Sequence, residues 1–331
     1  MALHPFLLFL GGLVVVVLGA ELLLRGATRI ATLLRISPII IGLTVVSVGT
    51  SAPELAVGLT AAHEGKGPLA VGNIAGTNIV NILLILGLSA AIRPLPTRSL
   101  SVRLDVPVMI ATAVVLFIMA LDGVLSPAEG LGLLLAAAIY TVALVQLSRQ
   151  EDPTTRLAFR DALAAQAPPP VNLGSGPKTW LWNGFLLLAG MALAVLGAEL
   201  LVAGAVDLAK AYGVSDAFIG LTIVAIGTSA PELVTTLIST ARNDRDVAIG
   251  NLIGSSIYNV LVILGLTMVA GPASGVDVSR EVLWIDLPLA ALVAIVCLPV
   301  FRSDRLVSRR EGIGFVLAYG AYLGSLLLWR H

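Results

Sequence analysis

The sequence predicts an all-α polytopic membrane protein: ten transmembrane helices as two inverted-topology five-helix repeats, with helices 2 and 7 broken. Of the 331 residues, 57% are hydrophobic and 12% are charged, and mean hydropathy is +0.98. Soluble domains contain about 25% charged residues. Apolar runs of about 20 residues, the length that spans a bilayer, recur along the chain. The phrase G-T-S-A-P-E occurs twice, 178 positions apart, each time inside such a run.

Ten apolar segments are long enough to cross a bilayer as helices. In chain order, the predicted spans are Phe6–Leu24, Pro38–Ala62, Leu69–Ile92, Asp105–Leu121, Pro127–Leu147, Trp182–Leu208, Ala217–Ala241, Val247–Ala270, Trp284–Phe301 and Gly312–Trp329.

The loop charges predict the orientation of these helices. With the N-terminus outside, one set of loops carries 16 of the 20 Lys and Arg residues and the opposite set carries 4. Because basic residues concentrate in cytoplasmic loops, we expect a multi-pass protein of the cell (inner) membrane with both termini outside. The 20 acidic residues cancel the basic ones, and no basic stripe predicts a nucleic-acid partner.

The repeat divides the chain into two halves. At an offset of 178, Gly12 matches Gly190 and Asn73 matches Asn251. Five helices are an odd number, so the second half enters the membrane from the opposite side. The predicted units are residues 1–148, a cytoplasmic linker at 149–181, and residues 182–331. Pro168-Pro169-Pro170 favours a plain tether for the linker; the alternative is a short interfacial helix at Arg156–Gln166.

The repeated phrase places polar groups at the middle of helices 2 and 7. Ser47, Thr50, Ser51 and Glu54 follow the i, i+3, i+4, i+7 spacing of one helical face. Pro53 has no N–H and breaks the helix, so freed carbonyl oxygens must be satisfied by protein, water or an ion. The second copy repeats the pattern at Ala225, Thr228, Ser229 and Glu232. A backbone carbonyl replaces the hydroxyl at Ala225 in this prediction.

Helices 3 and 8 each carry a polar stripe at four-residue spacing. The stripes are Asn73, Thr77 and Asn81 in the first half and Asn251, Ser255 and Asn259 in the second. We expect the four helices to converge around Glu54 and Glu232. Interhelical hydrogen bonding is the alternative role for Asn73 and Asn251.

The predicted ligands are all hard oxygen atoms, which suits calcium, a cation that takes six to eight of them. Magnesium remains an alternative with a stricter octahedral geometry. No histidine or cysteine lies near the phrase, which argues against zinc, copper and iron. S-A-P-E is also an ordinary helix start. Within an apolar segment, however, a central acid costs roughly 2.5–3.5 kcal/mol, which favours a functional role.

Other acidic residues have simpler interpretations. Glu21 has Arg25 four residues on and predicts a helical ion pair, whereas Glu199 has Ala203 there. Both acids are interpreted as structural or as lining an ion path. Asp105, Asp122 and Asp286 fall at predicted helix ends, where we expect them at the membrane interface.

At these motifs the chain resembles the cation/calcium exchanger superfamily, most closely the prokaryotic sodium/calcium exchangers. The resemblance rests on G-x-T-x-x-x-x-G-T-S-A-P-E at Gly42–Glu54 and Gly220–Glu232. It also rests on the G-N segments that run from Gly72 to Asn81 and from Gly250 to Asn259. It implies ten helices in two inverted halves with an ion cluster between helices 2, 3, 7 and 8.

The resemblance also implies roles for individual residues. Glu54 and Glu232 would bind calcium, with backbone carbonyls from Thr50 and Thr228. Oxygens for sodium would come from Ser51, Ser229, Thr77 and Ser255, and Asn81 and Asn259 would complete the centre. Potassium-dependent relatives carry an aspartate where this chain has Asn259, which favours potassium-independent exchange.

The expected function is therefore secondary antiport of Na⁺ for Ca²⁺ by alternating access, electrogenic at about three Na⁺ per Ca²⁺. A Ca²⁺/H⁺ antiporter and a K⁺-dependent Na⁺/Ca²⁺ exchanger are the alternatives within the fold, and a cation channel is the alternative of another class. We expect no enzyme activity, because no central aspartate pair or Ser-His dyad is present. The expected partners are Ca²⁺, Na⁺ and the lipid bilayer, with no cofactor, and a monomer suffices.

Overall fold

The chain folds as a mostly helical protein in a computed structural model that describes residues 4–34, 40, 42–97, 101–149, 176–212, 225–242, 245–303 and 305–329. Several helices contain π-helical (η) turns, which often occur at functional sites. The first half comprises α1 (Pro5–Leu34), η1 (Gly42–Val46), α3 (Ser47–Thr50), α4 (Ala52–His63), α5 (Gly67–Ile79), η2 (Val80–Leu86), α6 (Gly87–Ile92), β1 (Leu95–Pro96), η3 (Ser101–Asp105), α7 (Val106–Met119), the 3₁₀ turn η4 (Ala120–Asp122), β2 (Val124–Leu125) and α8 (Pro127–Arg149).

The second half repeats this order of elements. It comprises α10 (Pro177–Ala211), α12 (Ala225–Thr228), α13 (Ala230–Ala241), α14 (Arg245–Tyr258), η6 (Asn259–Leu264), α15 (Gly265–Ala270), β3 (Val276–Asp277), η7 (Val282–Asp286), α16 (Leu287–Arg302), β4 (Leu306–Val307) and α17 (Arg309–Trp329).

Seven helices in the described part of the chain are long and apolar enough to cross a membrane. An eighth span is a bent pair, in which Gly42–Thr50 meets Ala52–His63 at 51°. This bend confirms the predicted break in helix 2. The bend follows from Pro53, which cannot donate the backbone hydrogen bond that a continuous helix requires. The protein is an integral membrane protein.

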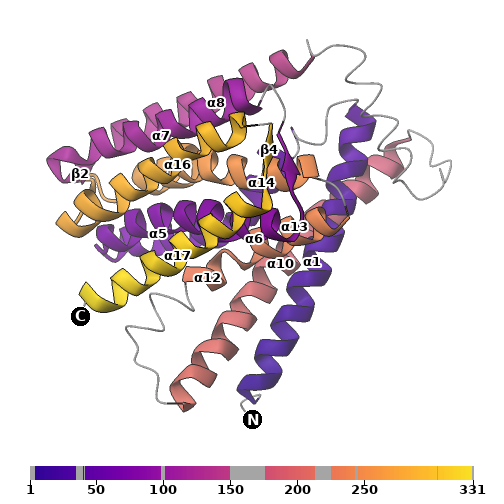
Figure 1. Cartoon of the computed structure of the whole chain (residues 1–331), viewed down its shortest axis with the longest axis horizontal. Helices are drawn as coiled ribbons and strands as arrows, with labels where there is room; N and C mark the ends of the chain where they lie inside the picture. Colours follow the sequence, from indigo (N-terminus) through magenta and orange to yellow (C-terminus); the bar gives the residue numbers. More distant parts are fainter. Residues whose placement is uncertain are drawn as a thin grey trace.

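The long helices α1 and α10 lie side by side and antiparallel, inclined to the bundle of α5, α7, α8, α16 and α17 (Figure 1). Glycines set their close approach: a Cβ on Gly12 would collide with the backbone of Leu201, and one on Gly190 with the backbone of Leu23. These two contacts are reciprocal, because Gly12 and Leu23 precede Gly190 and Leu201 by 178 positions. Small residues allow such close packing of membrane helices.

The other spans divide into central and peripheral helices. In the spans Gly67–Ile92 and Val247–Ala270, 72% and 83% of the most apolar window is buried, against 28% for Pro127–Leu147. The exposed stripe of α8 contains Leu131, Leu135 and Ile139, each about 60% exposed and spaced by four residues. A lipid bilayer suits such an apolar surface. The central spans carry the polar stripes predicted to form the site.

Two short antiparallel sheets tie the halves together, which the all-α prediction missed. Strand β1 pairs with β4 through Leu95 and Val307, and β2 pairs with β3 through Leu125 and Val276. Each strand has two residues, too few for a period-2 pattern to be recognised in the sequence. Each sheet joins a loop of the first half to a loop of the second.

Some predicted boundaries were also wrong. Helix α1 continues ten residues beyond the predicted end at Leu24, through Arg25 and Arg29, because charges close an apolar run without ending the helix. Helix α10 begins at Pro177, so the end of the predicted linker is helical. The proposed interfacial helix Arg156–Gln166 and the Pro168-Pro169-Pro170 run lie outside the described residues.

Candidate cation site

The two copies of G-T-S-A-P-E adopt the same local backbone. Ser51 has φ −84° and ψ 14°, and Ser229 has φ −83° and ψ 10°, between a four-residue helix and a longer one in each case. The longer helix begins with Ala-Pro, where proline is tolerated because first-turn N–H groups have no helical acceptor. The residues preceding α12 at 213–224 lie outside the described chain.

This local geometry places both glutamates in the first turn of a helix inside the protein. Glu54 on α4 and Glu232 on α13 are both 0% exposed, and they lie close enough to interact electrostatically. Among the described residues, no lysine or arginine is hydrogen-bonded to either carboxylate. Two buried like charges without a basic partner are costly unless a cation compensates them.

The two glutamates differ in their contacts. The Ser51 hydroxyl donates to Glu232 Oε1 at 3.0 Å, and Thr50 also lies beside this carboxylate. Neither side-chain oxygen of Glu54 is hydrogen-bonded to a described residue, although Thr77 lies beside it. Ser51 thus links the first copy of the phrase to the glutamate of the second by a hydrogen bond.

Asn251 of α14 joins the first copy to α13. The Ser47 hydroxyl lies 3.0 Å from the Asn251 carbonyl, and Thr50 Oγ1 lies 3.4 Å from Asn251 Oδ1. The Asn251 amide donates to Thr236 Oγ1 at 3.1 Å. The alternative prediction for Asn251, interhelical hydrogen bonding, is therefore confirmed. Asn73, its counterpart, is half-buried and its amide nitrogen has no hydrogen bond in the described structure.

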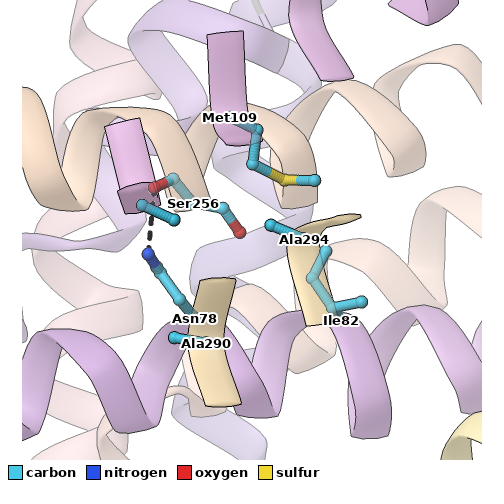
Figure 2. Close-up of a pocket in the computed structure, with 7 residues that line it drawn as sticks. Asn78, Ile82, Met109, Ser256, Ala290 and Ala294 are labelled. Carbon is cyan, nitrogen blue, oxygen red and sulfur yellow. Dashed lines mark hydrogen bonds between the residues drawn. The ribbon is translucent and has the colours of Figure 1, made fainter. Parts of the chain in front are cut away.

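Asn81 and Asn259 stand in π-helical turns, η2 and η6, at matching positions of the two halves. Asn259 donates to Asn78 Oδ1 at 3.1 Å. Asn78 in turn points towards the backbone of Ser256 and donates to its carbonyl, beside a small cavity that Met109 also lines (Figure 2). Two linked amides thus fix the orientation of Asn259, whereas neither side-chain polar atom of Asn81 is hydrogen-bonded to a residue that the structure describes.

Most predicted site residues are buried, and many of their side-chain oxygens have no hydrogen-bond partner among the described residues. Seven side-chain oxygens at predicted positions are buried and make no hydrogen bond to any described residue: both of Glu54, Glu232 Oε2, Asn81 Oδ1, Asn259 Oδ1, Ser229 Oγ and Ser255 Oγ. Thr77 is 3% exposed and Thr228, at the end of α12, is half-buried. Ala225 begins α12. Helices α4 and α13 contact η6 and η2 respectively, so these oxygens belong to adjoining elements.

Asp105 and Asp286, which were predicted to lie at the membrane interface, are buried within the protein. They are 1% and 5% exposed, and they accept hydrogen bonds from Tyr140 and Tyr322 at 2.9 and 3.3 Å. A tyrosine hydroxyl satisfies a buried carboxyl without bringing in a charge. Asp122 is exposed, as expected of an interfacial residue.

Glu21 forms the predicted ion pair with Arg25 and a second one with Arg242, which follows α13. Glu199, its counterpart on α10, is exposed.

The sequence profile of the family described as sodium/calcium exchanger protein matches residues 4–146 and 182–328. The chain belongs to this family. Its matched segments contain both broken helices and both polar stripes.

Three relatives show how far the likeness to family members extends. The inner membrane protein YrbG of Escherichia coli K12 is 37% identical over 265 residues, 80% of this chain and 79% of that protein. The sodium/calcium exchanger MaX1 of Methanosarcina acetivorans is 31% identical over 344 residues, covering 96% and 97%. A solved structure of the sodium-calcium exchanger NCX_Mj, soaked with Na⁺ and Ca²⁺, superposes with a TM-score of 0.80 at 28% identity, covering 98% and 99%.

Sequence reasoning missed Asn78 and the hydroxyls of α13. The four-residue stripe that selects Thr77 skips the next residue, Asn78. Its counterpart at the repeat offset, Ser256, is also polar, and paired polar residues inside two apolar spans were a usable signal. Four hydroxyls follow Glu232 at Thr235, Thr236, Ser239 and Thr240, but their counterparts in the first half are apolar, so the repeat did not point to them.

Proposed function

We propose that the protein exchanges Na⁺ for Ca²⁺ across the membrane by alternating access, as a K⁺-independent and electrogenic antiporter. The observation that carries the proposal is a pair of fully buried carboxylates, Glu54 and Glu232, that lie close enough to interact electrostatically. The buried oxygens around them, which lack hydrogen-bond partners in the described structure, suit hard cations. The ligands we propose are those predicted from the sequence, including the Ser47 hydroxyl and the backbone carbonyls of Thr50, Ala225 and Thr228.

Charge compensation couples the two fluxes in this account. With both glutamates ionised and no cation bound, the carrier would have to enclose two like charges, which opposes a change of side. One Ca²⁺ neutralises the pair, and so do Na⁺ ions at neighbouring oxygens. Exchange of about three Na⁺ for one Ca²⁺ moves net charge and responds to membrane voltage.

We further propose ten spanning helices in two inverted five-helix repeats. The reciprocal glycine contacts between α1 and α10 support this arrangement, as does the equal backbone at Ser51 and Ser229. Helices α1 and α10 are our candidate for the moving part, because the glycines between them let the two helices pack closely as one unit. The basic loops support placing both termini outside a cell (inner) membrane.

Asn259 supports sodium without potassium as the coupling ion. A neutral amide limits the site to the charge of two carboxylates, and the donation from Asn259 to Asn78 suits an amide rather than an acid. A proton-coupled Ca²⁺ antiporter and a K⁺-dependent exchanger are the competing outcomes of the test below. A channel is the competing class.

The test is ⁴⁵Ca²⁺ uptake into proteoliposomes with Na⁺, K⁺ and H⁺ gradients imposed one at a time. We expect uptake when Na⁺ is high inside and low outside, without added K⁺. Because about three Na⁺ leave for each Ca²⁺ that enters, uptake carries net positive charge outward and should be faster when the interior is made positive. Uptake driven only by a pH gradient would replace Na⁺ by H⁺ in the proposal. Uptake without any opposing cation gradient would make the protein a channel.

A further inference from the structure

Four hydroxyl residues follow Glu232 along one face of α13: Thr235, Thr236, Ser239 and Thr240 stand three, four, seven and eight residues after the acid. This spacing places them on the same side of the helix as Glu232. All four are 0–1% exposed. They extend over about 12 Å from the acid towards the end of α13, at the usual rise of 1.5 Å per residue.

Three of these hydroxyls lack the hydrogen bond that several other buried or half-buried helical hydroxyls make. Thr267 and Thr141, for example, donate to the carbonyls four residues back, Ile263 and Ala137, at 2.8 and 2.7 Å. Thr235, Ser239 and Thr240 make no hydrogen bond to any described residue, and Thr236 is occupied by the Asn251 amide. Because a buried hydroxyl without a partner is destabilising, a transient ligand gives this face a reason to be polar.

The corresponding face of α4 is apolar. At the same distances after Glu54 stand Val57, Gly58, Ala61 and Ala62. Ala61 and Ala62 are part of the main hydrophobic core, and a Cβ on Gly58 would meet Thr267 Oγ1 of α15. The two faces share a backbone and a neighbouring acid, so the hydroxyls of α13 are not required by the fold of this motif.

The polar face runs towards the exposed end of α13. Helix α13 ends at Ala241, and the Arg242 side chain that follows is 47% exposed. Its guanidinium is paired with Glu21, which neutralises the positive charge at this end. Helix α6 contacts α13 and contributes Ser89, another buried hydroxyl without a hydrogen-bond partner in the described chain.

We propose that the α13 face formed by Thr235, Thr236, Ser239 and Thr240 lines the route by which the transported cation moves between the carboxylate pair and the membrane surface at Arg242. The inference rests on the proposed antiport. Hydroxyl oxygens replace part of the hydration shell of a hard cation without holding it strongly. In the conformation described here the route is closed, since its hydroxyls are buried.

Cysteine labelling tests whether the α13 face, and not the corresponding face of α4, lines the cation route. In a Cys297→Ala background, Ser239→Cys and Thr240→Cys are compared with the matched α4 variants Ala61→Cys and Ala62→Cys, using a membrane-impermeant cationic methanethiosulfonate reagent. We expect the α13 variants to react from the Arg242 side, more slowly when Ca²⁺ is bound, and the α4 variants to stay unlabelled. Equal labelling on both helices, or none on α13 in variants that still transport, would overturn the inference.

Isosteric variants supply a second measurement. Replacing Thr235 by Val, Ser239 by Ala and Thr240 by Val together is expected to slow Ca²⁺ exchange by about tenfold while equilibrium Ca²⁺ binding stays within about twofold. Thr267→Val, which removes a buried hydroxyl that donates to its own helix, is the control and should exchange normally. Wild-type-like exchange by the triple variant contradicts the route alone. Absence of Na⁺-driven Ca²⁺ flux in the wild type contradicts the proposed function instead.

Discussion

The two copies of G-T-S-A-P-E have the same sequence and backbone but different contacts. Ser51 of the first copy donates to Glu232 of the second, while the Ser229 hydroxyl and the side-chain oxygens of Glu54 make no hydrogen bond to described residues. Beyond each acid, α13 carries hydroxyls where α4 carries apolar residues. Since the sequence and backbone of the phrase are equal, the differences in its hydrogen bonds arise from the surrounding helices, whereas the difference beyond each acid lies in the sequence of α4 and α13. Two copies of one motif can therefore lie in two unequal environments.

The largest effect is expected from removing either glutamate, and it should be the same for both copies of the phrase. Glu54→Gln and Glu232→Gln should each abolish Ca²⁺ exchange, because one remaining carboxylate cannot neutralise a divalent cation. Glutamine keeps the shape of the side chain, so the proteins should remain folded. The measurement is ⁴⁵Ca²⁺ exchange in proteoliposomes, with elution on size exclusion as the folding control. Wild-type exchange by either variant would remove that glutamate from the site.

Substitution of Ser51 and of Ser229 should have different effects on Ca²⁺ affinity, unlike substitution of the two glutamates. Ser51→Ala removes a hydrogen bond to a carboxylate, worth about 1.5–3 kcal/mol, so we expect apparent Ca²⁺ affinity to change by roughly 10–100-fold. Ser229→Ala, the matched variant, removes a hydroxyl without a hydrogen bond in the described structure and should change affinity less. Concentration dependence of ⁴⁵Ca²⁺ uptake measures both. Equal effects would mean that the observed asymmetry has no functional consequence.

Substitutions in the contact between α1 and α10 should have similar effects in the two halves of the chain. Gly12→Ala and Gly190→Ala each force a methyl group into the backbone of the partner helix, and overpacking of this kind costs about 1–3 kcal/mol. We expect both variants to lower thermal stability and exchange rate by similar amounts. Gly11→Ala, where an added Cβ meets no atom within 4 Å, is the control and should behave as wild type. A stable, active Gly12→Ala protein would contradict the close packing.

The smallest expected effect concerns the paired asparagines. Asn259→Asp adds a carboxylate and removes the donation to Asn78, so we expect Ca²⁺ exchange to become sensitive to K⁺ or pH. Asn81→Asp adds the same charge without breaking a hydrogen bond of the Asn81 side chain to any described residue, and it serves as the matched comparison. Flux across K⁺ and pH series measures both. An unchanged ion profile in Asn259→Asp would refute the role assigned to that amide.

Local sequence signals predicted the elements and the acids, and failed where contacts are distant. The length of the apolar runs predicted the spans that begin with α5, α8 and α14 to within a few residues, and Pro53 predicted the bend before α4. The donation from Ser51 to Glu232 joins residues 181 positions apart and depends on how the four central helices pack. The burial of Asp105 was missed for the same reason, because its partner Tyr140 lies on another helix.

The central claim is that Glu54 and Glu232 together hold one divalent cation. Equilibrium ⁴⁵Ca²⁺ binding to the purified protein, with Na⁺ as competitor, tests it most directly. The account predicts one Ca²⁺ per chain, displaced by Na⁺, and binding lost in both Glu54→Gln and Glu232→Gln. Unaltered Ca²⁺ affinity in either variant would contradict it.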